Sequence, residues 1–143
     1  MRKIVVLLIA AGALVLAAVS LAGTTRSAGW SAKLDASQEI PKQAVKVPAA
    51  KGAFTATISG AKLHWKLTFS KLSGPAAAAH IHLGAMGKSG NVLVPLCGPC
   101  KSGVSGTATL TAALKKDFTK HLLYVNVHTA KNPAGEIRGQ LGG

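Results

Sequence analysis

The chain has 143 residues, 48% of them hydrophobic and only 4% aromatic, so it can form one domain with a mainly aliphatic core. Its 17 Lys and Arg residues against 4 Asp and Glu give a formal net charge of +13, which favours anionic partners such as cell-surface polymers. Four acids argue against a paired-carboxylate hydrolase, and the scarcity of arginine and aromatic residues argues against nucleic-acid binding.

The N-terminus has the three parts of a secretion signal. Arg2 and Lys3 form a positively charged start, residues 4–19 are an uncharged apolar run, and residues 20–22 (Ser-Leu-Ala) have the small residues that a signal peptidase requires. We therefore predict a signal peptide over residues 1–22, with Ala28 as an alternative cleavage position, and a secreted or extracytoplasmic protein of the periplasm or cell envelope. The other interpretation is an uncleaved membrane anchor, and only then do we expect contact with a membrane.

Residues 23–29 are small and polar and predict a short linker before a single domain over residues 30–141. From Trp30 onward, apolar and polar residues alternate with period two, and turn residues interrupt them roughly every eight to twelve positions. Such alternation indicates antiparallel strands with one wet face, and two layers must then cover each other. We predict an all-β, antiparallel Greek-key sandwich of about eight strands, at 30–35, 54–58, 63–69, 77–83, 91–96, 104–111, 121–128 and 135–141.

Three stretches carry a family resemblance: residues 34–41 (LDASQEIP), residues 79–84 (AHIHLG), and residues 123–141, which contain LYVNVHT and NPAGEIRGQL. With these stretches the chain resembles the CHRD (chordin-type) domain over residues 30–141. The resemblance implies an extracytoplasmic β-sandwich. It implies little about activity, because a fold alone does not confer one.

A weaker similarity concerns the copper–zinc superoxide dismutases, which are also Greek-key sandwiches. They carry a His-x-His on one strand, another copper-binding histidine at the end of a later strand, and an arginine nearby. Here His80, His82, His128 and Arg138 are in comparable places. The long loop with the bridging histidine and the zinc ligands has no counterpart, so dismutase activity is not predicted.

The histidines on two predicted strands suggest a metal site. His80 and His82 are two residues apart, so both rings leave the same face of the sheet, and His128 lies on the polar face of a later strand. If these strands are neighbours, three imidazoles can bind Cu(II) or Zn(II) and leave one ligand position open. The alternative is that the rings only form hydrogen bonds to backbone or carboxylate groups. The residues expected around the histidines are Tyr124, Asn126, Glu136 and Arg138.

Cys97-Gly98-Pro99-Cys100 has the letters of a thioredoxin redox motif, but the sequence after it predicts a turn and a strand where that motif requires a helix. We predict a disulfide between Cys97 and Cys100, as expected in an oxidising compartment. Thiol–disulfide exchange is the alternative.

The sequence contains no nucleophile elbow and no phosphate-binding glycine loop. We therefore expect an exported binding or structural module, with extracytoplasmic proteins or anionic polymers as partners, and not an enzyme. The first alternative is a copper- or zinc-binding protein, or a copper-dependent redox enzyme, that uses the three histidines. The second is a thiol–disulfide redox protein.

Overall fold

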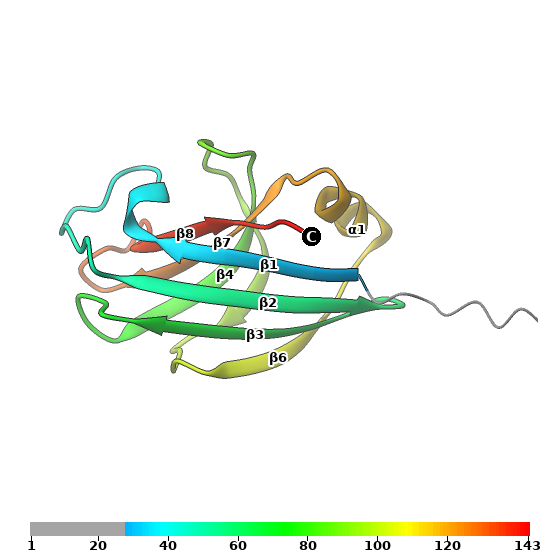
Figure 1. Ribbon diagram of the computed structural model, residues 1–143, viewed down its shortest axis with the longest axis horizontal. Coiled ribbons are helices and arrows are strands. Elements are labelled where there is room, and N and C mark those ends of the chain that lie inside the picture. The colour runs from blue at the N-terminus through cyan, green and yellow to red at the C-terminus, as the bar shows by residue number, and fades with distance from the viewer. Residues whose placement is uncertain (1–27) are drawn as a thin grey trace, which may run out of the picture.

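The computed structural model describes residues 28–143, which form eight strands, one α-helix and one short 3-10 helix (Figure 1). The predicted signal peptide lies outside these residues. In the part that is described, no helix is long and apolar enough to cross a membrane. In chain order the elements are β1 (Ala28–Asp35), η1 (Ala36–Gln38), β2 (Lys51–Ser59), β3 (Lys62–Ser70), β4 (Ala76–Leu83), β5 (Val92–Cys97), β6 (Val104–Thr109), α1 (Ala112–Thr119), β7 (Leu123–Thr129) and β8 (Ile137–Gln140).

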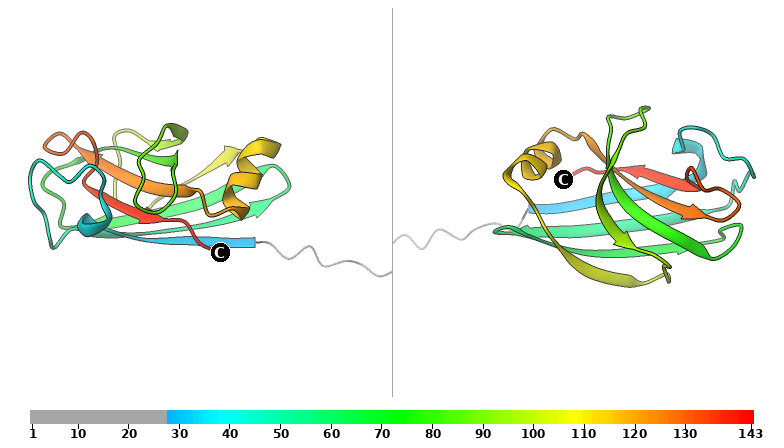
Figure 2. Two further views of the ribbon diagram at one scale, coloured as in Figure 1. Left: turned by 90° about the horizontal axis from the view of Figure 1, so that it is seen from above. Right: turned by 180° about the vertical axis from the view of Figure 1, so that it is seen from behind.

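The strands form one antiparallel sheet, in the order β5-β4-β7-β8-β1-β2-β3-β6, which folds over on itself into two layers (Figures 1 and 2). The layers join where β8 meets β1, through the pair Asp35–Arg138 and the bridge Ser31–Gly142. The predicted all-β antiparallel sandwich is confirmed. Its two layers are parts of one sheet and not two separate sheets, because β8 pairs with β1. This pairing leaves fewer strand edges without hydrogen bonds.

Alternation along each strand builds the core between the layers. On β3, the side chains of Leu63, Trp65 and Leu67 are buried while His64 and Lys66 between them are exposed, as period two requires. The ring of Phe54 on β2 stacks against that of Trp65, with 6.4 Å between the ring centres. This apolar burial supplies the main driving force for the fold.

Helix α1 closes one end of the sandwich (Figure 2). Its N-cap is Thr111, whose side chain accepts a hydrogen bond from the backbone N–H of Leu114. Leu114 and Phe118 face the core, where the Phe118 ring meets Trp30 edge-on at 5.2 Å between ring centres. The helix therefore covers apolar surface that the strands leave open at this end.

Loops cover the outward face of β4, β7 and β8, so its polar residues are buried as well. Tyr124, Asn126 and Arg138 are each only 2% exposed. After β4 the backbone N–H of Gly90 donates to the Tyr124 hydroxyl, and after η1 the carboxylate of Glu39 accepts from the Asn126 amide. A buried polar layer thus lies outside the apolar core, and it holds the candidate site.

Candidate metal site

Strands β4 and β7 bring His80, His82 and His128 together on the face of the sheet that points away from the core. The strands pair so that Asn126 lies opposite His80 and Tyr124 lies opposite His82. The ring centres are 5.0 Å apart for His80 and His128, 5.5 Å for His80 and His82, and 5.8 Å for His82 and His128. The structure therefore brings together the three histidines that the sequence singled out.

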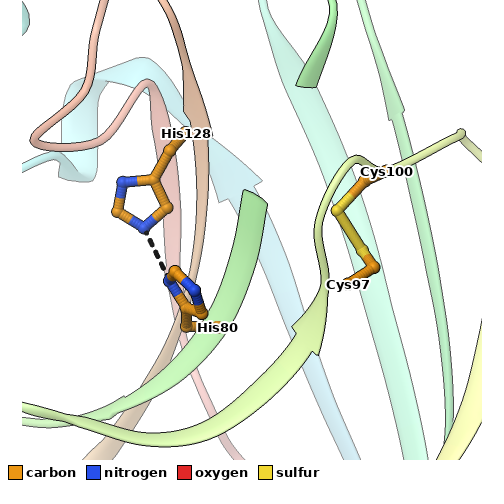
Figure 3. Close-up of a disulfide and its surroundings, with 4 residues drawn as sticks. All are labelled: His80, Cys97, Cys100 and His128. Atoms are coloured by element: carbon orange, nitrogen blue, oxygen red, sulfur yellow. Dashed lines mark hydrogen bonds between the residues drawn. A yellow bond between two sulfur atoms is a disulfide. The ribbon is translucent and has the colours of Figure 1, made fainter. Parts of the chain in front are cut away.

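The nitrogen positions are close to what one metal ion requires. The Nδ1 atom of His80 and the Nε2 atom of His128 are hydrogen-bonded at 3.2 Å (Figure 3), and an ion that binds both nitrogens would replace this hydrogen bond. Two nitrogens that each lie about 2.0–2.1 Å from a tetrahedral ion are separated by roughly 3.3 Å. One ligand atom from each of the three rings lies within 4.8 Å of the others, so the three nitrogens must move closer together to bind one ion.

Backbone carbonyls fix the protonation of two of the rings. The Nδ1 atom of His82 donates to the Gly90 carbonyl at 3.0 Å, and that of His128 donates to the Pro133 carbonyl at 3.0 Å. Because a carbonyl only accepts, each ring carries its proton on Nδ1 and leaves a lone pair on Nε2. Metal-binding histidines are oriented in this way. The Nε2 atom of His82 is also buried and has no hydrogen-bond partner among residues 28–143.

Burial keeps the three imidazoles neutral. Desolvation is the largest cause that lowers the pKa of His80 and His82. The bond to Gly90 opposes this for His82, while the charge of Arg138 lowers the pKa of His82 further and that of His82 lowers the pKa of His80. For His128 desolvation, together with the neighbouring rings, lowers the pKa to about 4, although the bond to Pro133 opposes this. Neutral rings offer their lone pairs at pH 7 without first losing a proton.

Tyr124 and Arg138 form the wall beside His82. The Tyr124 ring stacks on the His82 ring, with 4.9 Å between the centres and 10° between the planes. The guanidinium carbon of Arg138 lies 3.5 Å from the centre of the Tyr124 ring, a cation–π contact. Asn126 lies between His80 and Arg138 in the strand register. Three of the four residues expected around the histidines therefore flank them.

A family model described as the CHRD domain matches residues 30–141. The chain belongs to the CHRD-domain family. The matched range includes all three histidines and both strands that carry them. No curated protein and no solved structure matches the chain.

Glu136, the fourth expected neighbour, lies in a different cluster of this CHRD domain. Its carboxylate accepts hydrogen bonds from Ser73, Thr129 and the Asn132 amide, and none from the three histidines within residues 28–143. Burial alone raises its pKa, but these hydrogen bonds outweigh burial and lower it. Glu136 therefore fastens the turn between β7 and β8.

Glu39 is a site neighbour that the sequence did not single out. It is fully buried, and its Oε1 atom accepts from the Asn126 amide at 3.1 Å and from the backbone N–H of Ile40 at 3.1 Å. Desolvation raises its pKa to about 7, against the opposing effects of these bonds and of the charges on Arg138 and Lys42. The contact with Asn126 joins residues 87 apart in the chain, so no local pattern indicates it.

The predicted disulfide between Cys97 and Cys100 is present, at the end of β5 (Figure 3). Cys97 lies opposite Ala79, whose side chain is fully buried, and both cysteines pack with the core. The disulfide therefore lies on the core side of β4, whereas the histidines lie on the outer side. The other two histidines of the chain are exposed elsewhere: His64 lies on β3, and His121 lies in the turn that follows α1.

Proposed function

We propose that this CHRD domain is an exported module that binds one divalent transition-metal ion, Cu(II) or Zn(II), through His80, His82 and His128. The observation that carries the proposal is the convergence of three neutral imidazoles on two paired strands. The hydrogen bonds to Gly90 and Pro133 support it, because they present Nε2 lone pairs in advance. The N-terminal sequence supports export.

Three nitrogen ligands leave a position for water or another molecule, and the Irving–Williams order favours Cu(II) over Zn(II). Bound copper supplies a one-electron redox centre, and bound zinc supplies a Lewis acid. Within residues 28–143 no carboxylate forms a hydrogen bond with the three rings, and Glu39 accepts from Asn126 and Ile40 through its Oε1 atom. These contacts assign no general base to the site, and we propose binding as the function and not hydrolysis.

Isothermal titration calorimetry of residues 23–143 with Cu(II) and with Zn(II) tests the proposal. We expect one ion per chain, and we expect His80→Ala and His128→Ala each to lose at least about tenfold in affinity, since each removes one of three ligands. His64→Ala is the matched control, because it removes an exposed histidine from the other layer. Equal affinity in all four proteins contradicts the proposal, provided that circular dichroism shows the variants to be folded.

A further inference from the structure

A cleft of about 260 Å³ lies over β8, between the segment that follows η1 and the segment that follows β4. Pockets for drug-sized ligands usually measure about 300–1,000 Å³, so this cleft suits a smaller molecule. Its lining includes Ile40, Lys42, Met86, Gly87, Arg138 and Gln140.

Arg138 brings a buried positive charge to the cleft, and no carboxylate in the described chain forms a salt bridge with it. Its Nη2 atom donates to two neutral oxygens, the Ala85 carbonyl at 3.2 Å and the side chain of Gln140 at 3.4 Å. Its Nη1 atom is buried and has no partner within residues 28–143. Glu39 is the carboxylate whose charge acts on Arg138, but it forms no salt bridge with it, so this guanidinium retains the capacity to bind an anion.

The remaining lining suits an anion with an apolar part. Lys42 adds a second positive charge, and none of the residues that line the cleft is acidic. The ammonium group of Lys42 donates to the Ser37 carbonyl, which leaves further N–H groups free for a ligand. Met86 is 79% exposed and shares the cleft with Ile40, and a methionine side chain adapts readily to apolar ligands.

We propose that this cleft binds a small organic carboxylate, with the carboxylate at Lys42 and Arg138 and the aliphatic part between Ile40 and Met86. None of the three proposed metal ligands lines the cleft. The inference therefore goes beyond the metal site and does not depend on it.

Titration of the metal-free, ¹⁵N-labelled protein with butyrate, followed by NMR, tests the inference. We expect saturable shifts of the backbone amides of Ile40, Lys42, Met86 and Gly87, which are the walls of the cleft. Acetate, which lacks the apolar part, is expected to bind more weakly, and butylamine, which has the opposite charge, is expected not to bind. Equal shifts with butylamine and butyrate, or shifts that do not saturate, overturn the inference.

Two variants with the same change of charge provide the matched comparison. Lys42→Gln is expected to weaken butyrate binding about three- to fivefold, the size expected for an exposed ion pair. Lys46→Gln lies in the same segment but does not line the cleft, and it is expected to bind butyrate like the unaltered protein. Equal affinities in the two variants overturn the inference. Lys42 and Lys46 are both on the surface, so neither substitution is expected to prevent folding. The comparison therefore needs no substitution at the buried Arg138.

Discussion

Glu39, Asn126 and Arg138 form a buried cluster in which each side chain keeps one polar atom without a hydrogen-bond partner among the described residues: Oε2, Oδ1 and Nη1 respectively. A buried polar atom left unpaired costs about 1–3 kcal/mol. The three unpaired atoms therefore lower the stability of the folded state. The cluster that contains them forms a polar wall beside the histidines. Of the three residues, Glu39 responds most to pH near neutrality, because its pKa is raised to about 7.

Glu39→Gln is predicted to change how stability depends on pH. Burial raises the pKa of Glu39 from 4.5 to about 7, so between these pH values the folded state holds more protons than the unfolded state. Stability due to this group is therefore complete below pH 4.5 and falls as the pH rises towards 7. Glutamine stays neutral and keeps the acceptor for Asn126. In urea denaturation, the unfolding free energy of the variant minus that of the unaltered protein should rise by roughly 3 kcal/mol between about pH 5 and pH 8.

The difference between the two proteins is the quantity to measure, because the contributions of all other groups are the same in both proteins and cancel in the comparison. Arg138 and Lys42 are the charged groups that face Glu39, and both are unchanged in the variant. A difference in unfolding free energy that stays constant with pH contradicts the assigned state of Glu39.

Gly135→Ala is predicted to destabilise the protein by about 3 kcal/mol, through backbone strain and overpacking together. Gly135 has φ +141°, and a Cβ atom there meets the side chains of Asn126 and Glu39 at 2.6 Å. Gly60→Ala is the control, because Gly60 has φ +58° but no atom within 4 Å of such a Cβ. It should lose only about 1 kcal/mol in urea denaturation. Equal losses contradict the tight packing at Gly135.

At the scale of elements, the alternation along the chain is informative because it is local. It predicts that His80 and His82 leave one face of β4, and in the structure Ala79 and Ile81 are buried on the other face. It gave no sign that loops would cover this outer face, because that depends on contacts between segments far apart in the chain. Glu136 illustrates the limit: it was expected beside the histidines, but its partner Ser73 is 63 residues away in the chain, and no local pattern indicates that contact.

The disulfide at the end of β5 is predicted to stabilise the fold without affecting the metal site. It closes a loop of four residues, so replacing Cys97 and Cys100 by serine should cost about 2 kcal/mol of unfolding free energy on the chain-entropy estimate. Copper affinity should not change, because the disulfide and the histidines lie on opposite sides of β4. Calorimetry and urea denaturation of the double variant measure both quantities. A loss of copper binding in a folded double variant contradicts this separation.

At the scale of the whole molecule, positive charge is spread unevenly over the two layers. The outer face of β1, β2 and β3 carries exposed lysines, and its acidic residue is Asp35, at one corner. The Asp35 carboxylate accepts hydrogen bonds from Ser37 and Gln38 at the start of η1. The exposed lysines of this face are Lys33, Lys51, Lys62 and Lys66.

We expect this face to associate with anionic surfaces in a salt-dependent way. Sedimentation with beads that carry an anionic polysaccharide should show binding that weakens from about 50 mM to about 500 mM salt, because salt screens exposed charges. The double variant Lys62→Gln/Lys66→Gln should bind more weakly than Lys115→Gln/Lys116→Gln, which removes the same charge from α1. Equal binding of the two variants indicates that net charge alone is responsible and contradicts a role for this face.

The class of fold was predictable because eight stretches of period-two sequence leave few ways to bury their apolar sides. Trp30, Leu63 and Ile81 were all assigned to strands and are all buried. The pairing of β8 with β1 was not predictable, because the choice between two separate sheets and one folded sheet depends on pairing between the two ends of the domain.

The most direct test of the proposed metal site is a crystal structure of the protein loaded with Zn(II) or Cu(II), with anomalous diffraction recorded at the absorption edge of the metal. We predict one main anomalous peak per chain, about 2.0–2.2 Å from one nitrogen each of His80, His82 and His128. A loaded crystal whose peaks lie instead at the exposed His64 or His121, or that has no peak between β4 and β7, contradicts the account.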